Sequence, residues 1–112
     1  MTTNATILLA FLAVVFVISG LSKASGNAKG LSGTRDVNVK DGIARVIGVF
    51  EALFALGLIL GLKWNWMAYF PLLGLWFFIA GAVFFHFKVG KVKTAFPAFF
   101  LLTLISVALV LI

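Results

Sequence analysis

Four ionisable side chains lie within or at the edges of the long apolar runs of this 112-residue chain: Lys23, Arg45, Glu51 and His86. A carboxyl group can act as a general acid or base, and an imidazole can pass protons near neutral pH. Glu51 is therefore the candidate acid or base, and His86 the candidate proton shuttle. A pocket that joins them to the two cations would suit a quinone head group or a proton relay.

The same residues also have a purely structural interpretation. Glu51 can pair with a Lys or Arg whose aliphatic stem extends along a helix, and such a pair would lock helices together without doing any chemistry. Lys23 and Arg45 lie at the ends of apolar runs, where positive charges ordinarily determine membrane topology. For Glu51 both interpretations stay open at this point.

Other kinds of chemistry find little support in the composition. The chain has no cysteine, which excludes disulfides, thiol exchange, iron-sulfur ligation and cysteine-bound zinc. One histidine with one nearby carboxylate is not a convincing metal-ligand set, and the usual pair of axial histidines for a membrane haem is absent. We therefore expect no metal site and no covalently bound cofactor. A quinone is the one cofactor that these residues suggest.

The elements that position these residues are predicted to be membrane-spanning. The chain is 63% hydrophobic and only 11% charged, with a mean hydropathy of +1.22, whereas about a quarter of the residues in soluble domains are charged. A water-soluble core of this size could not bury so much apolar surface. The net charge of +6 comes from Lys and Arg in short gaps between apolar runs, a pattern of membrane topology and not of nucleic-acid binding.

A helix needs about 20 apolar residues to cross a bilayer. Four segments meet this length, and two prolines, Pro71 and Pro97, lie near helix starts, where proline is tolerated. We predict an all-α polytopic membrane protein, an antiparallel four-transmembrane-helix bundle that forms a single domain over residues 1–112. The predicted spans are residues 6–22, 43–62, 67–87 and 95–112, with cytoplasmic loops at 23–42 and 88–94. A cleaved signal peptide is the alternative for the first span, but its basic n-region is missing.

The loop at 23–42 is rich in Gly, Ser and Asn, and its stretch from 25 to 33 is predicted to be flexible. Asp36 or Asn38 is expected to cap the helix that continues into the second span. Every Lys and Arg except Lys63 lies on the side of the two loops, so the positive-inside rule places both termini outside the cytoplasm. We expect the aromatic side chains of Trp64, Trp66 and Tyr69 to lie at the outer interface between membrane and water.

Small residues mark the predicted contacts between helices. Gly48 shares one side of the second span with Glu51, Ala52 and Ala55, which makes a small-residue face that carries one carboxyl group. Further glycines with helical spacing are Gly57, Gly61, Gly74 and Gly81. We expect them to pack within the bundle, and antiparallel packing would gather Lys23, Arg45, Glu51 and His86 at the cytoplasmic end.

Three ordered segments resemble the DoxX-like family. They are Ser19-Gly20-Leu21-Ser22-Lys23 at the end of the first span, Arg45-Val46-Ile47-Gly48-Val49-Phe50-Glu51 at the start of the second, and Ala80-Gly81-Ala82 followed by His86 at the end of the third. The resemblance covers essentially the whole chain. It implies a compact four-helix bacterial membrane protein, commonly associated with redox systems such as thiosulfate:quinone oxidoreduction, and it points to Lys23, Arg45, Glu51 and His86 as the site.

Two functions follow as expectations. The first is an accessory subunit that packs in the bilayer against a larger membrane complex, respiratory or redox-associated, in the bacterial cytoplasmic membrane. The second is a quinone-linked oxidoreductase component that uses the polar pocket while a partner supplies electrons. A small transporter is disfavoured because the repeats and broken helices of that class are missing. Since the chain has few catalytic groups of its own, the sequence leaves open whether it is an enzyme.

Overall fold

The computed structural model describes residues 2–36 and 38–112, and all regular secondary structure in these ranges is helical. The prediction of an all-α fold is confirmed for this part of the chain. In chain order the elements are α1 (Thr3–Ala24), α2 (Ala28–Asp36), α3 (Asp41–Gly61), the 3-10 helix η1 (Asn65–Ala68), α4 (Tyr69–Lys88), the 3-10 helix η2 (Val92–Ala95) and α5 (Phe96–Leu111).

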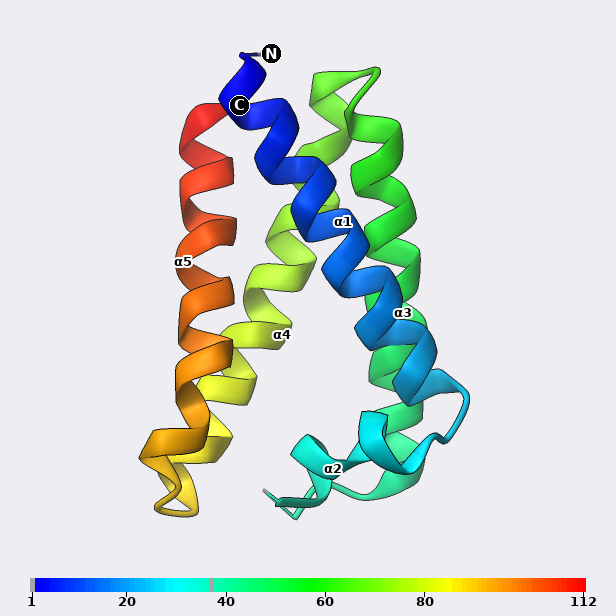
Figure 1. Cartoon of the computed structure of the whole chain (residues 1–112), viewed down its shortest axis with the longest axis vertical. Coiled ribbons are helices and arrows are strands. Elements are labelled where there is room, and N and C mark those ends of the chain that lie inside the picture. Colours follow the sequence, from blue (N-terminus) through cyan, green and yellow to red (C-terminus); the bar gives the residue numbers. More distant parts are fainter. Residues whose placement is uncertain (1, 37) are drawn as a thin grey trace.

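The four long helices lie in the four apolar segments of the sequence. Three helical segments, Thr3–Ala24, Asp41–Gly61 and Asn65–Lys88, are long and apolar enough to cross a membrane, and Phe96–Leu111 is a shorter apolar helix. The start of α1 and the end of α5 lie at one end of the molecule, and α2 lies at the other (Figure 1). Large apolar side chains point outward along all four long helices, as lipid contact requires. The chain is a membrane protein with several apolar helices.

The core is densest at the end where α1 begins and α5 ends. There α3 and α4 are joined by a tight turn, and side chains from all four long helices meet. Toward the opposite end the helices separate into two pairs, α1 with α3 and α4 with α5 (Figure 1). The largest fully buried apolar side chains are Leu9, Leu12, Phe16, Leu58, Leu72, Leu75 and Ile105.

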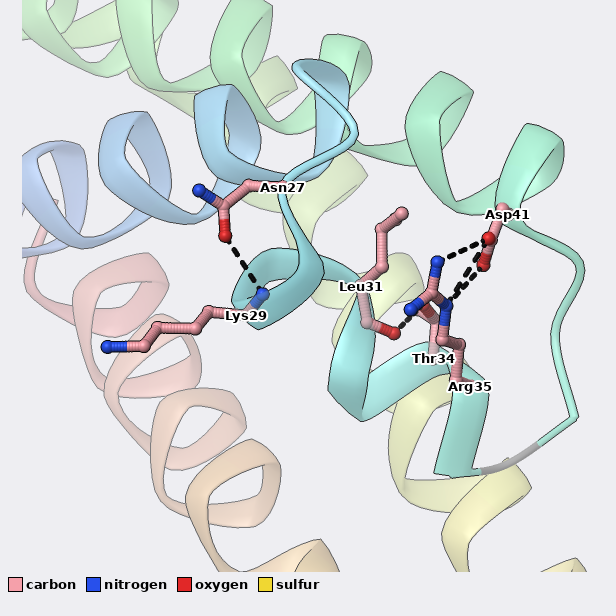
Figure 2. Close-up of polar contacts among 6 residues, drawn as sticks. All are labelled: Asn27, Lys29, Leu31, Thr34, Arg35 and Asp41. Atoms are coloured by element: carbon pink, nitrogen blue, oxygen red, sulfur yellow. Dashed lines mark hydrogen bonds and ion pairs between the residues drawn. The ribbon is translucent and has the colours of Figure 1, made fainter.

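The loop between α1 and α3 is more ordered than the sequence indicates. Most of its predicted flexible part lies in helix α2, so that prediction is wrong from Ala28 onward. The side-chain oxygen of Asn27 accepts a 2.8 Å hydrogen bond from the Lys29 backbone N–H at the start of this helix (Figure 2). The one large apolar side chain of α2, Leu31, is only 2% exposed. Burial of that side chain is a tertiary contact that composition does not reveal.

The connection from α2 to α3 also differs from expectation. α3 begins at Asp41, and Lys40 precedes it without a side-chain cap, so the predicted capping by Asp36 or Asn38 is wrong. Asn38 instead takes a left-handed backbone conformation with φ of 63°, which Asn tolerates better than most residues. The two helices are clamped by Arg35, which donates hydrogen bonds of 3.0 and 2.7 Å to the Asp41 carboxylate (Figure 2). This carboxylate raises the pKa of the Arg35 guanidinium, through the hydrogen bonds and the opposite charge.

Candidate functional site

The site is built where the backbones of α1 and α3 touch. A Cβ atom added at Gly20 would lie 2.6 Å from the Gly48 carbonyl oxygen and 2.6 Å from the Ala52 backbone nitrogen. One added at Gly48 would lie 2.7 Å from the Gly20 carbonyl oxygen and 2.6 Å from the Lys23 Cβ. All four separations are shorter than real Cβ contacts, so only glycine fits at these two positions. The small-residue face predicted around Gly48 is therefore the contact surface for α1.

A buried ion pair lies beside this crossing. The Lys23 Nζ is 2.7 Å from Glu51 Oε1, and the Ser19 hydroxyl donates a 2.9 Å hydrogen bond to Glu51 Oε2. Ser19 and Lys23 are four residues apart on α1, so both side chains face the same carboxylate. Glu51 is 1% exposed, whereas the side chain of Lys23 is 20% exposed. Both carboxylate oxygens thus have a donor from α1.

The ion pair explains how the bundle tolerates a carboxylate in an apolar helix. A buried charge is very costly unless it is paired and hydrogen-bonded. Glu51 meets both conditions, and among the described residues no buried side-chain nitrogen or oxygen lacks a partner. The lysine stem reaches from the last turn of α1 toward the carboxylate, while its 20% exposure keeps part of the side chain near the surface. This geometry matches the structural interpretation of Glu51, with Lys23 as the partner.

Ser19 is a site residue that the sequence pattern does not single out, although it lies in the first of the three segments that resemble the DoxX-like family. A hydroxyl in an apolar helix is common and carries little signal, since it can bond to its own backbone. The available signal was its spacing of four residues from Lys23, which puts both on one face of α1. That spacing becomes informative only once α3 is known to pack there.

Arg45 lies near the ion pair but has a different partner. Its Nε donates a 3.1 Å hydrogen bond to the backbone carbonyl of Ala24, the last residue of α1. The last carbonyls of a helix have no partner within the helix and carry partial negative charge, so a guanidinium there stabilises the helix end. The side chain is exposed. Arg45 therefore caps α1 and does not take part in the carboxylate cluster.

His86 is not brought to the ion pair. The rings of Phe50 and Phe78 lie 6.2 Å apart and put Phe78 at the level of Glu51. His86 follows Phe78 by eight residues, which is about 12 Å further along α4. The described hydrogen-bond partners of the Glu51 carboxylate are Ser19 and Lys23. The predicted pocket of four residues is thus divided, because α4 leaves α3 toward α5 in this half of the molecule (Figure 1).

The remaining predicted packing glycines differ in what surrounds them. At Gly57, an added Cβ would lie 2.5 Å from the Pro71 Cγ. At Gly61 it would lie 2.6 Å from the Ala68 Cβ, and at Gly74 it would lie 2.5 Å from the Phe54 ring. These three glycines hold α3 against the start of α4. A Cβ at Gly81 would meet nothing within 4 Å, so this glycine has no close neighbour in the chain outside its own helix.

Two open apolar grooves lie outside the ion-pair cluster. One, of about 360 Å³, runs between α1 and α3. The other, of about 200 Å³, is lined by Phe87, Ala95, Phe96 and Phe99 at the far end of α4 and α5. Neither groove contains Glu51 or Lys23. Within the described residues, no group of three or more His, Cys, Asp or Glu side chains is placed to hold a metal ion.

Comparison with known proteins identifies the family of the chain. Neither the curated proteins nor the solved structures contain a significant match. A family model described as the DoxX-like family matches residues 7–108, a range that includes both partners of the ion pair and both of the other predicted site residues. Because this match spans nearly the whole sequence, the chain belongs to the DoxX-like family.

Proposed function

We propose that this protein is a non-catalytic integral membrane subunit that packs against a larger membrane complex. One observation carries the proposal: the only buried ionisable side chain among the described residues, Glu51, is enclosed, and both its oxygens accept hydrogen bonds from Lys23 and Ser19. A catalytic carboxylate needs access to a substrate proton. Here both oxygens hold helices together, and the grooves on the surface are lined by apolar residues.

The subunit crosses the bacterial cytoplasmic membrane four times, with both termini outside. The fourth crossing is supported by the combined length of η2 and α5, because residues 92–111 rise about 32 Å at the usual helical spacings. That is close to the hydrocarbon thickness of about 30 Å. The orientation with both termini outside is supported by the distribution of charge, because Lys63 is the only Lys or Arg at the end opposite α2. Trp64, Trp66 and Tyr69 are exposed at that same end, as an interfacial aromatic belt requires.

A partner complex is favoured by how little of the chain lies outside the apolar helices. The exposed surface of the long helices consists largely of apolar side chains, including Phe77, Phe84, Phe96 and Phe100. Such a surface suits lipid and another membrane subunit equally well, whereas the two connections beyond α1 and α4 are too short to form a domain in water. The redox character of the complex is the expectation that the family resemblance supplies.

Extraction of the tagged protein from its own membranes in a mild detergent tests this proposal. We expect a stoichiometric larger partner on a native gel, and the same partner with Glu51→Gln, because the neutral amide removes a proton-transfer group without removing its hydrogen-bonding capacity. Recovery of the chain alone, without any partner, would contradict the accessory role. Loss of the activity of the assembled complex in Glu51→Gln, at unchanged assembly, would contradict the non-catalytic role.

The alternative function, a quinone-linked oxidoreductase component, is favoured by one observation. The groove formed by Phe87, Phe96 and Phe99 lies at the end of α4 that also carries His86, and flat aromatic rings suit a quinone. Under this alternative His86→Gln lowers quinone-dependent turnover of the membrane complex, whereas Val110→Leu, at an exposed residue near the end of α5, leaves it unchanged. Equal turnover in both variants would remove the alternative.

A further inference from the structure

The larger of the two grooves lies on the lipid-facing surface between α1 and α3. One wall is formed from α1 by residues that include Ala10, Val14 and Ile18. The other is formed by Ile59 of α3 and by Leu62, the residue that follows α3. Val14 and Ile18 are 59% and 65% exposed, so the groove is open along its length. From Ala10 to Ile18 the helix rises about 12 Å. This length is close to the thickness of one leaflet, which is half of a hydrocarbon core of about 30 Å.

A cation follows the groove lining directly in the sequence. Lys63 directly follows the groove residue Leu62, and its Nζ lies 4.8 Å from the centre of the Trp64 ring. Both side chains are exposed in the turn between α3 and η1. The turn therefore presents an ammonium group and an interfacial aromatic ring at the level where lipid head groups lie. A lysine ammonium has three donors, so contact with a ring face leaves others for a phosphate.

We propose that this groove binds one anionic phospholipid, with an acyl chain between α1 and α3 and the head-group phosphate on Lys63. The apolar walls recognise only the chain, because they offer no polar group for it to bind. The selection among lipids comes from Lys63, since a basic residue at a membrane surface favours an anionic head group. The site is separate from the Lys23 and Glu51 ion pair and does not depend on the accessory role.

The charge of Lys63 also favours a phospholipid over two other apolar occupants of the groove, a quinone and a helix of a second copy of the chain. A quinone has an uncharged head and gains little from an ammonium group. A helix of a second copy of the chain would bring its own Lys63 or its apolar residues to the groove and would leave the cation without an anionic partner. A lipid with an acidic head satisfies both the apolar groove and the cation.

Native mass spectrometry of the full chain tests the site with two probes, dioleoyl phosphatidylglycerol and dioleoyl phosphatidylcholine. The protein is purified in mild detergent, stripped of lipid, and returned to equal amounts of the two. We expect one retained lipid, with phosphatidylglycerol preferred about fivefold, as a single basic residue near the surface provides. Lys63→Gln should bring the ratio of the two lipids to about one, while Lys88→Gln at the other end of the molecule should leave it unchanged.

A second pair of variants tests the groove itself. Ala10→Phe fills the groove from the α1 wall and should reduce retention of both lipids, whereas Val110→Phe, at a residue 85% exposed on α5, should not. Equal retention of the two lipids by the unmodified protein would overturn the proposal, as would an unchanged preference in Lys63→Gln. Retention of a quinone from the native membrane, or a dimer that Ala10→Phe abolishes, would assign the groove to another occupant. Lys63 lies in an exposed turn, so its variant decides the head-group site even when Ala10→Phe does not accumulate.

Discussion

The two helix pairs of the molecule are held together in different ways. α1 and α3 meet through small residues, with backbones in contact at Gly20 and Gly48, and carry a buried ion pair beside that contact. α4 and α5 meet through larger side chains, and the hydrogen bond described between them runs from the Trp76 Nε1 to the Ser106 hydroxyl at 3.1 Å. Both pairs lie in the same apolar surroundings.

The contrast shows which forces act between helices in lipid. Lipid tails are as apolar as Leu, so burial of apolar side chains gives no large gain, and close packing and polar contacts specify the helix pair. Between α1 and α3, the close packing at Gly20 and Gly48 and the ion pair lie side by side. The hydrogen bond described between α4 and α5 joins two neutral side chains, so a single change there should matter less.

Loss of the ion pair should have the largest effect. Lys23→Met leaves the Glu51 carboxylate buried without its cation, and we expect it to lower the free energy of unfolding by about 3 kcal/mol. Addition of Glu51→Gln to this variant should recover part of the loss, because the amide carries no charge. Unfolding in mixed detergent micelles, followed by circular dichroism, measures both variants. Lys29→Met on exposed α2 is the control, and equal stability of the two lysine variants would break the comparison.

The backbone contact should be the next most sensitive feature. Gly48→Ala puts a methyl group against the Gly20 carbonyl and the Lys23 side chain, and we expect a loss of about 2 kcal/mol from the forced separation of the helices. Gly81→Ala is the matched control within a helix. Its methyl group meets nothing, so it should gain up to about 1 kcal/mol from helix propensity. The same unfolding assay applies, and a similar change in both variants would contradict the close contact.

A pair of serine variants compares the polar contacts directly. Ser19→Ala removes a hydrogen bond to a charged group and should cost about 1.5 kcal/mol. Ser106→Ala removes the acceptor of the Trp76 indole N–H and should cost about 0.6 kcal/mol, the average for neutral hydrogen bonds between membrane helices. A larger loss in Ser106→Ala than in Ser19→Ala, again measured by unfolding, would reverse the order of the two helix pairs.

The smallest effect is expected outside the apolar helices. Arg35→Gln removes an exposed ion pair to Asp41, and exposed pairs contribute little to global stability. It should instead loosen α2, which the pair clamps to α3. Hydrogen exchange checks this: amides of α2 should exchange faster in the variant, while those of the α1 and α3 crossing stay unchanged. Slower or equal exchange in α2 would show that the Arg35 and Asp41 pair does not hold the helix.

Much of the molecule follows from local sequence patterns. The apolar runs predict the four long helices because each is long, nearly uncharged and bounded by basic or aromatic residues. The expectation of an internal ion pair follows from the cost of an isolated carboxylate at Glu51. By contrast, the composition of the first loop indicates flexibility, and the helix there forms because Leu31 finds a buried place and Arg35 reaches Asp41. Those contacts depend on residues distant in space, which a local pattern does not contain.

The sequence by itself therefore determined an all-helical membrane protein with one carboxyl group that needed a partner. Only the tertiary structure decided which cation that partner is. Lys23, Arg45 and His86 all lie near helix ends, and no spacing rule within one helix ranks them. The crossing of α1 and α3 at Gly20 and Gly48 brings Lys23 and Ser19 to Glu51, and the departure of α4 toward α5 takes His86 away. The packing of glycine backbones thus selects the ion pair.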